Sequence, residues 1–315
     1  MRLLLLGGTA FLGRAAAAEA LARGHDVTLF TRGRTNPGLF PEAEQLVGDR
    51  DGDLAALEGR SFDSVLDLSG YVPAHVRASA ELLRESGHYA FVSSVSVYAD
   101  FTEGPDEGSP VAELGDGPVD RLAEDYSNYG PLKALCEDEV RRVFEERALV
   151  VRPGLIAGPH DPTGRFTYWA RRLARGGELL APGPPKRRVQ FVDARDLGTW
   201  LIDCAEARLA GTFNATNEGV AWAELLAGAD VTWVDDAFLL EHEVGPWLEL
   251  PLWVPGEGPF RAMHEVDVSR AVAAGLRFRP VAETLAAAAT APETETAGLT
   301  PEREAALLAA WHARR

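Results

Sequence analysis

The feature that most constrains this chain is a glycine-containing loop at residues 7–13, which lies between an apolar run and an alanine-rich segment. The apolar run is four leucines long and belongs to a predicted strand at 2–6, and the alanine-rich segment covers 14–23 and stops at Gly24, a residue suited to end a helix. The order strand, glycine turn and helix begins a βαβ unit. Free amides at the start of such a helix bind anions, and the pyrophosphate of a dinucleotide is the usual ligand.

Within this loop, Gly7 permits a tight turn and Gly13 allows the helix and the strand to approach each other closely. Ala10 stands where the common dinucleotide pattern has a glycine, so the backbone approaches the phosphate less closely. An ordinary glycine turn is the alternative, but the flanking strand and helix favour nucleotide binding. The loop residues that we expect to contact the cofactor are Gly7, Thr9, Ala10, Phe11, Leu12 and Gly13.

Short apolar runs alternate with helical patterns through the first half of the chain, which is typical of repeated βαβ units. We therefore predict an α/β fold: a Rossmann-type doubly wound parallel sheet with a smaller C-terminal substrate-binding lobe. The predicted strands are 2–6, 26–30, 44–47, 64–68, 89–93 and 148–151, and the clearest helices are 14–23 and 128–146.

Proline and glycine cluster after Pro153, and this change of composition indicates a second lobe. The order of helices and strands in residues 221–280 cannot be predicted from periodicity. Thr300 and Pro301, by contrast, are typical of the start of a helix. We predict a dinucleotide-binding domain at 1–152, to which the chain returns at about 189–215. The predicted substrate-binding lobe consists of 153–188 and 216–289. A linker and a terminal helix follow at 290–315.

Charge and composition exclude several classes of function. With 48 acidic against 31 basic side chains the formal charge is -17, which opposes binding to nucleic acid or to anionic lipid. Cys136 and Cys204 lie in helical patterns, and without a Cys/His cluster we expect no structural metal. No apolar run approaches the roughly 18 residues that span a bilayer. We expect a cytoplasmic protein with a small-molecule substrate and no nucleic-acid or membrane partner; a homodimer is left open.

The end of the second predicted strand bears on the choice of cofactor. NAD-specific domains usually carry an acidic residue there for the ribose hydroxyls, and Thr31 removes that carboxylate. Arg32 and Arg34 offer charge and planar donors to a 2′-phosphate instead. The alternative is a pair of solvated loop arginines, but the pattern favours NADP over NAD.

Tyr129 and Lys133 are four residues apart on a predicted helix, so both side chains share one face. An ammonium near a phenol lowers the phenol's pKa, which suits proton exchange with a carbinol or carbonyl oxygen, and it can also bind the nicotinamide ribose. Tyr126 lacks such a partner, because Gly130 occupies the matching position. Ser94 follows a predicted strand at the sheet edge where ligands bind, and its hydroxyl could polarise the substrate oxygen.

The neighbouring serines, Ser93 and Ser96, are more simply explained as strand terminators that satisfy local backbone groups. Spacing alone does not make the pair Tyr129 and Lys133 specific, because any helix can carry it by chance. Its strength comes from its position after the serines and the glycine loop.

Taken in order, these motifs resemble the extended short-chain dehydrogenases/reductases, called NAD-dependent epimerases/dehydratases, and within them an atypical branch. The resemblance covers Met1 to roughly Leu285, and the ordered set is far more specific than any single motif. The matching motifs are the 7–13 loop, Gly48 and Asp49, Ser69 and Gly70, Ser93 to Tyr98, Tyr129 to Lys133 with Cys136 and Glu137, and Arg152 to Gly158.

The resemblance implies Ser94 as the donor to the substrate oxygen, Tyr129 as acid and base, and Lys133 as its electrostatic partner. It places Asp49 near the adenine and residues 153–156 beside the nicotinamide. The further cofactor contacts expected on this basis are Arg50, Leu68, Ser69, Gly70, Lys133, Pro153, Leu155 and Ile156. One departure is that no asparagine occurs between Leu39 and Ser127, where the family often has a catalytic one.

Three functions fit these features. The first is an NADP(H)-dependent oxidoreductase of the carbonyl reductase or alcohol dehydrogenase type, acting on a small molecule or natural product. The second is a nucleotide-sugar epimerase or dehydratase with retained NAD(P), for which Lys186, Arg187 and Arg188 supply a basic cluster; Arg188 resembles the arginine that grips a substrate diphosphate. No Asp-Glu dyad follows Ser94, which argues against dehydration. The third is an NADP-binding redox sensor without turnover.

Overall fold

The computed structural model describes residues 1–290 and 297–314. Its centre is a seven-stranded sheet in which every neighbouring pair is parallel. The strand order is β11-β6-β5-β4-β1-β2-β3, so it reverses between β1 and β4, the point where such sheets bind ligands. The strands are β1 (Arg2–Leu6), β2 (Asp26–Thr31), β3 (Glu44–Val47), β4 (Ser64–Asp67), β5 (Tyr89–Val92), β6 (Ala148–Pro153) and β11 (Gly211–Ala215).

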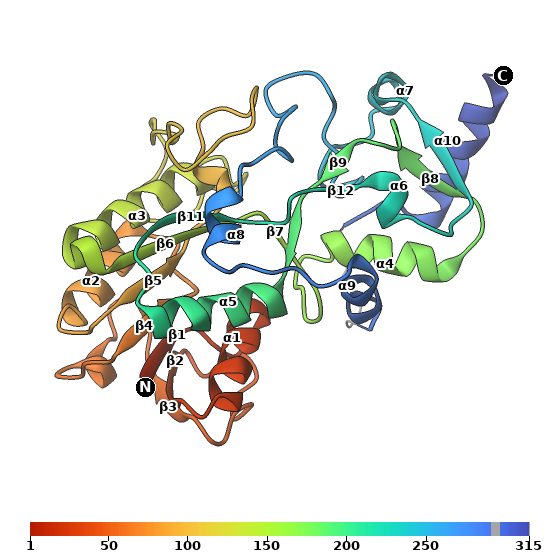
Figure 1. Ribbon diagram of the computed structural model, residues 1–315. Helices are drawn as coiled ribbons and strands as arrows, with labels where there is room; N and C mark the ends of the chain where they lie inside the picture. The colour runs from red at the N-terminus through yellow and green to blue at the C-terminus, as the bar shows by residue number, and fades with distance from the viewer. Residues whose placement is uncertain (291–296, 315) are drawn as a thin grey trace.

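Helices cover both faces of this sheet (Figure 1). The leucines of β1 show why: Leu3 and Leu5 pack with α1 and α5, whereas Leu4 and Leu6 pack with α2 and α3. Because successive side chains of a strand point to opposite faces, a run of leucines suits only a strand that is buried on both sides. The covering helices are α1 (Phe11–Ala22), α5 (Ala194–Ala207), α2 (Pro73–Leu82) and α3 (Tyr129–Phe144), with the 3-10 turns η1 (Ala55–Leu57), η2 (Val95–Val97) and η3 (Glu145–Arg147) nearby.

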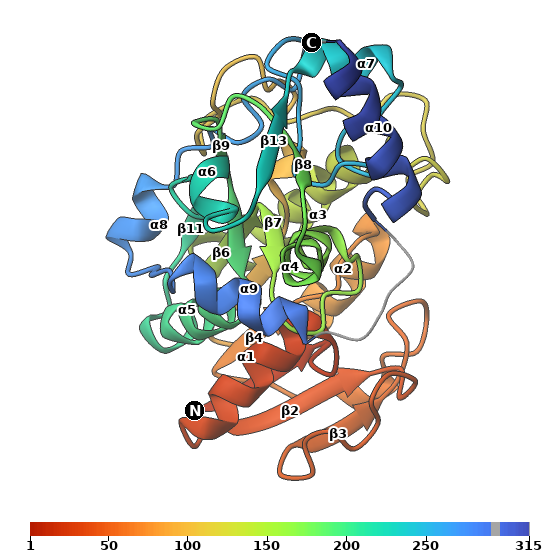
Figure 2. The same cartoon turned by 90° about the vertical axis from the view of Figure 1, so that its right-hand side faces the viewer.

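The smaller lobe lies beyond the carboxyl edge of the sheet (Figure 2). Its core is rich in aromatic side chains, among them Trp169, Trp222 and Trp253, all fully buried. Its elements are three two-stranded sheets, β7 (Leu155–Ala157) with β10 (Phe191–Asp193), β8 (Leu179–Pro182) with β13 (Val231–Val234) and β9 (Arg188–Val189) with β12 (Val220–Ala221), and the helices α4 (Arg165–Arg175), α6 (Trp222–Leu225), α7 (Asp236–Glu241), α9 (Val281–Ala289) and α10 (Pro301–Ala313). The short α8 (Ser269–Ala273) packs against β11.

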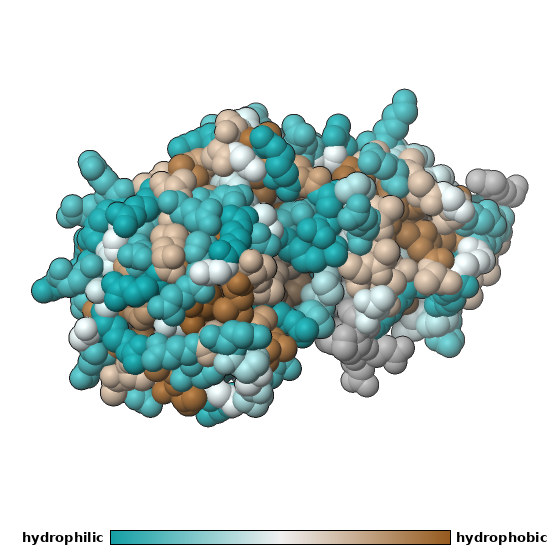
Figure 3. All heavy atoms as spheres, turned by 60° about the horizontal axis from the view of Figure 1, so that its bottom comes forward, coloured by the Kyte–Doolittle hydropathy of each residue, from teal (hydrophilic) through white to brown (hydrophobic). Residues whose placement is uncertain are grey.

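The α/β fold and all six predicted strands of the first half are confirmed, with ends that differ by two residues at most. The chain re-enters the large layer at α5, which packs on α1, and at β11, which pairs with β6. Residues 291–296 of the predicted linker lie outside the described residues. In the described part, no helix is long and apolar enough to cross a membrane. The face in Figure 3 mixes hydrophilic side chains with separate apolar patches.

Candidate active site

Tyr129 and Ser94 lie together at the carboxyl edge of the sheet. Ser94 follows β5, and its Oγ accepts a hydrogen bond from the Ser96 amide at 3.1 Å and so caps η2. The Ser94 hydroxyl donates to the Ser96 hydroxyl at 3.1 Å, and it is also a polar neighbour of Tyr129 that lowers the pKa of the phenol. Burial raises the pKa of Tyr129 to about 12, while Ser94 and the charge of Arg165 act in the opposite direction. In the ligand-free chain the phenol is therefore protonated at neutral pH.

Two neighbours of Tyr129 set its position. Asn128 does not cap α3 with its side chain, because that side chain holds the preceding loop: its Oδ1 accepts from the Ala123 amide at 2.8 Å and its Nδ2 donates to the Pro118 carbonyl at 2.7 Å. Gly130 lets α3 touch η2, since a Cβ at this position would lie 2.0 Å from the Ser96 carbonyl oxygen. The absence of a side chain at Gly130 brings the tyrosine to the serine.

Lys133, one helical turn after Tyr129 in α3, is buried. Its Nζ donates to the Gly70 carbonyl at 2.7 Å and to the Val92 carbonyl at 2.6 Å, and lies 4.3 Å from the centre of the Phe91 ring. Burial lowers the pKa of Lys133 to about 8. The ammonium thus ties the ends of β4 and β5 together, and the groups that lower the pKa of Tyr129 in this state are Ser94 and Arg165 rather than the expected Lys133.

The glycine loop fits a dinucleotide pyrophosphate. A Cβ at Gly13 would lie 2.6 Å from the Gly8 nitrogen, so only glycine lets α1 pack this closely on the loop. Ala10, the residue before α1, offers no side-chain cap, which leaves the first helical amides to a ligand. The Asn36 side chain fixes the loop by donating to the Thr9 carbonyl at 2.8 Å. Phe11 and Leu12 open the helix.

Arg32 and Arg34 follow β2, next to the β1 loop, and both are exposed. Among the residues that the structure describes, neither guanidinium has a hydrogen-bond or ion-pair partner. Thr31 accepts a hydrogen bond from the Gly33 amide at 3.2 Å, which turns the chain at this point. Two unpaired guanidinium groups at the end of β2 fit a phosphate on the adenine-side ribose.

Asp49 and Arg50 lie after β3 in different environments. Asp49 is half-buried and its Oδ1 accepts from the Asp51 amide at 3.1 Å. Arg50 forms a two-pronged ion pair with buried Asp67, at 2.6 and 2.7 Å, and also donates to Ser79. The guanidinium of Arg50 therefore binds residues of β4 and α2. These contacts support a structural role for Arg50 rather than the expected contact with the cofactor.

The other expected cofactor residues lie at the carboxyl ends of β4 and β6. Ser69 donates from its Oγ to the Leu6 carbonyl at 3.0 Å, which joins the ends of β4 and β1 at the switch point. The Gly70 carbonyl is the acceptor of Lys133. The remaining residues along this edge are Leu68, Pro153, Leu155 and Ile156.

A cavity of about 540 Å³ opens in the smaller lobe, and both basic side chains and the carboxylates of Glu218, Glu265 and Asp267 line it. Lys186, Arg187 and Arg188 all line it. Arg187 forms an ion pair with Asp236 at 2.7 Å, whereas the exposed Arg188 donates from its Nε to the Gly219 carbonyl at 2.9 Å and has no ion-pair partner in the described part of the chain. The structure therefore separates the predicted cluster into one paired arginine and two cations that face the cavity.

Sequence reasoning missed Arg165, the first residue of α4. Its charge acts on Tyr129, although 36 positions separate them along the chain. No motif or spacing in the sequence marks this residue, because its importance arises only when the smaller lobe packs over the sheet edge. Within the described ranges, no group of three His, Cys, Asp or Glu side chains could hold a metal ion.

The sheet, its loop and the edge residues define a dinucleotide-binding protein of the Rossmann class. Residues 3–214 match the NAD dependent epimerase/dehydratase family, and the chain belongs to that family. The family is described as NAD-dependent, and the glycine loop described above fits a dinucleotide of that kind.

A curated relative is the chloroplast stem-loop binding protein of 41 kDa b of Arabidopsis thaliana, 31% identical over 226 residues. That match covers 64% of this chain, and the chain spans only about half, 54%, of the relative. The fold is also similar to the Bordetella bronchiseptica enzyme WbmH in complex with NAD+, with a TM-score of 0.65, 18% identity and coverage of 91% of this chain and 96% of that one.

A second similar fold is that of UDP-glucuronic acid 4-epimerase from Bacillus cereus in complex with NAD. Its TM-score is 0.61 at 15% identity, with coverage of 91% of this chain and 97% of that one. At these identities the two structures show the shared fold alone. The resemblance to the epimerase/dehydratase family is thus confirmed by the family match and is consistent with the fold.

Proposed function

We propose that this chain is an NAD(P)-dependent epimerase that acts on a secondary carbinol of a nucleotide sugar and retains its cofactor. The observation that carries the proposal is the contact between Tyr129 and Ser94 at the sheet edge, with the buried ammonium of Lys133 one helical turn further along α3. Arg188 and Lys186 support a diphosphate substrate, because they line the cavity of the smaller lobe without an ion-pair partner among the described residues, although three carboxylates line the same cavity. Bound NAD(P) supplies the hydride acceptor and donor.

The chain's own residues handle the proton. In the oxidative direction the Tyr129 oxygen takes the proton of the substrate hydroxyl as the carbon loses hydride, and in the reductive direction it returns that proton to the carbonyl oxygen. Ser94 donates a hydrogen bond to the same substrate oxygen and stabilises the charge that develops on it. Since the ligand-free phenol has a pKa of about 12, proton donation to a carbonyl is favoured as the site stands. The oxidative step needs the phenolate of Tyr129, which the charge of Arg165 favours.

Epimerisation is preferred over dehydration, because Val95 and Ser96 follow Ser94 and no acidic pair is available there for elimination. A second candidate is an NADPH-dependent carbonyl reductase that releases its cofactor in each cycle. The observation that favours it is the pair of unpaired arginines after β2, Arg32 and Arg34, since a 2′-phosphate is typical of a dissociating reductant.

Cofactor retention distinguishes the two candidates. Purified protein is denatured, the released nucleotides are identified by chromatography, and native protein is incubated with UDP-sugars without added cofactor. The epimerase proposal predicts nearly one NAD(P) per chain and interconversion of epimers. Empty protein that steadily oxidises NADPH with carbonyl compounds would support the reductase. Turnover in neither assay would contradict both enzymatic proposals.

The name of the curated relative includes stem-loop binding, but the charge of this chain opposes such an activity. The formal charge of -17 would have to be overcome at a phosphate backbone, which carries about one negative charge per 1.7 Å of duplex. The same assays include a structured RNA as a negative control.

A further inference from the structure

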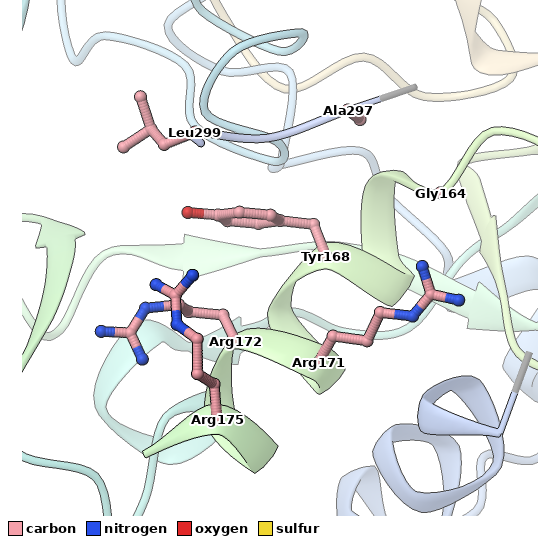
Figure 4. A pocket seen from close by; sticks show the side chains of 7 residues that line it. All are labelled: Gly164, Tyr168, Arg171, Arg172, Arg175, Ala297 and Leu299. Carbon is pink, nitrogen blue, oxygen red and sulfur yellow. The ribbon is translucent and has the colours of Figure 1, made fainter. Parts of the chain in front are cut away.

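Helix α4 carries four arginines, and two of them share one ion-pair partner within the protein. Arg172 donates to Glu304 of α10 at 2.7 Å and also binds the Gly176 carbonyl, while Arg175 contacts the same carboxylate. Figure 4 shows these two side chains together on one side of the helix and Arg171 on the other, around Tyr168. This part of α4 therefore serves the packing of the C-terminal helix.

Arg165 differs from these arginines. It is half-buried in the first turn of α4, and no acceptor among the described residues lies within hydrogen-bond or ion-pair distance of its guanidinium. Its guanidinium carbon lies 5.4 Å from the centre of the Trp247 ring, which fixes its orientation. Burial lowers the pKa of Arg165, and its charge lowers the pKa of Tyr129. Arg165 is thus a partly desolvated cation that acts electrostatically on Tyr129 and has no counter-ion in contact within residues 1–290 and 297–314.

An unpaired acceptor lies in the same turn of the chain. Asp161 is 3% exposed; its Oδ1 accepts from the amide and the hydroxyl of Thr163, both at 2.8 Å. Its Oδ2 is buried and, in the described structure, has no hydrogen-bond partner. Burial raises the pKa of Asp161, and Arg165 partly opposes that rise. Buried polar groups are normally paired, so a free donor group and a free acceptor close together indicate that a ligand completes both.

We propose that Arg165 is a specificity-determining residue that binds a carboxylate of the substrate next to the carbinol on which Tyr129 acts, with Asp161 Oδ2 accepting a hydrogen bond from a neighbouring substrate hydroxyl. The inference rests on the proposed function, since it takes Tyr129 as the reacting centre. A planar monoanion fits a single guanidinium edge, whereas the nearby carboxyl of Asp161 would repel a dianionic phosphate. The substrate class is therefore a sugar acid or a related hydroxy acid.

Matched ligand pairs test this assignment. Binding to the cofactor-loaded protein is measured by calorimetry for UDP-glucuronate against UDP-glucose and for glucuronate against glucose, which differ at one carboxylate. We expect the acid of at least one pair to bind about ten to a hundredfold more tightly than its neutral partner, the range of a charge-assisted contact. Arg165→Gln should abolish the difference and leave the affinity for the neutral member unchanged, and Arg165→Lys should restore part of it.

Arg171→Gln is the matched control, because it removes the same charge from another face of the same helix and should preserve the preference. Equal binding of acid and neutral members in both pairs, absence of binding included, would overturn the assignment, as would a preference that survives in Arg165→Gln. The same measurements distinguish failure of the proposed function from failure of the role assigned to Arg165. If only free glucuronate shows the preference, the nucleotide-sugar proposal fails while the role of Arg165 stands. Epimerisation of UDP-glucose without any acid preference would support the proposed function and overturn the role of Arg165.

Discussion

Gly130→Ala should damage the active site although alanine is the better helix former. The added Cβ would lie 2.0 Å from the Ser96 carbonyl oxygen, whereas real Cβ contacts are essentially never under 3.0 Å. Relieving this overlap requires about 1 Å of separation between α3 and η2, and a displacement of that size at a reacting centre costs roughly a hundredfold in rate. Overpacking costs about 1 to 3 kcal/mol and the better helix propensity returns about 1 kcal/mol, so the net loss of stability is expected to be about 1 kcal/mol.

The assay combines urea unfolding with single-turnover hydride transfer, measured on whichever UDP-sugar or carbonyl compound proves to be a substrate in the assays proposed above. Gly115→Ala is the matched control, because no atom lies within 4 Å of a Cβ built there and its φ is ordinary. That variant should match the wild type in both measurements. A Gly130→Ala protein that keeps wild-type stability and rate would refute the close approach of α3 to η2 as the cause of the Tyr129 to Ser94 contact.

Three further outcomes follow from the charged groups. NADP(H) should bind at least about tenfold more tightly than NAD(H), or roughly 1.4 kcal/mol, and replacing both Arg32 and Arg34 with alanine should remove the difference in calorimetry; equal affinities in the wild type would contradict the assignment. Because burial lowers the pKa of Lys133 to about 8, its ammonium is present below that pH and lost above it. The rate of hydride transfer should therefore decline above about pH 8. A rate that stays unchanged up to about pH 10 would argue against a role for the ammonium. Arg188→Ala should raise KM for a diphosphate substrate without changing NADPH affinity, and an unchanged kcat/KM would return Arg188 to the role of a solvated loop residue.

The large layer could be predicted from the sequence because its signals are local. The leucine run of β1 is buried on both faces and the alanine-rich α1 ends at a glycine, so period and composition are enough to place them. Tyr129 and Lys133 could be placed on one helix for the same reason, since they are four residues apart in α3.

The smaller lobe could not be predicted, because its short elements are stabilised by distant partners. Helix α6 has 4 residues, and its Trp222 is buried against Trp169 of α4, with ring centres 4.8 Å apart. The same limit applies to single side chains: Arg50 binds Asp67, 17 positions away, and Arg165 meets Tyr129 only through the packing of the lobes. A residue whose role depends on such a contact leaves no period or spacing to detect.

The most direct test of the central claim is the rate of hydride transfer in Tyr129→Phe, which removes the hydroxyl and leaves the ring. Circular dichroism and cofactor titration first establish that the variant is folded and loaded, and Tyr126→Phe serves as the control because that side chain is 67% exposed and lacks a lysine partner. The account predicts that single-turnover transfer falls by roughly two to four orders of magnitude in Tyr129→Phe and not in Tyr126→Phe. Near-normal transfer by Tyr129→Phe would contradict it, whatever the substrate proves to be.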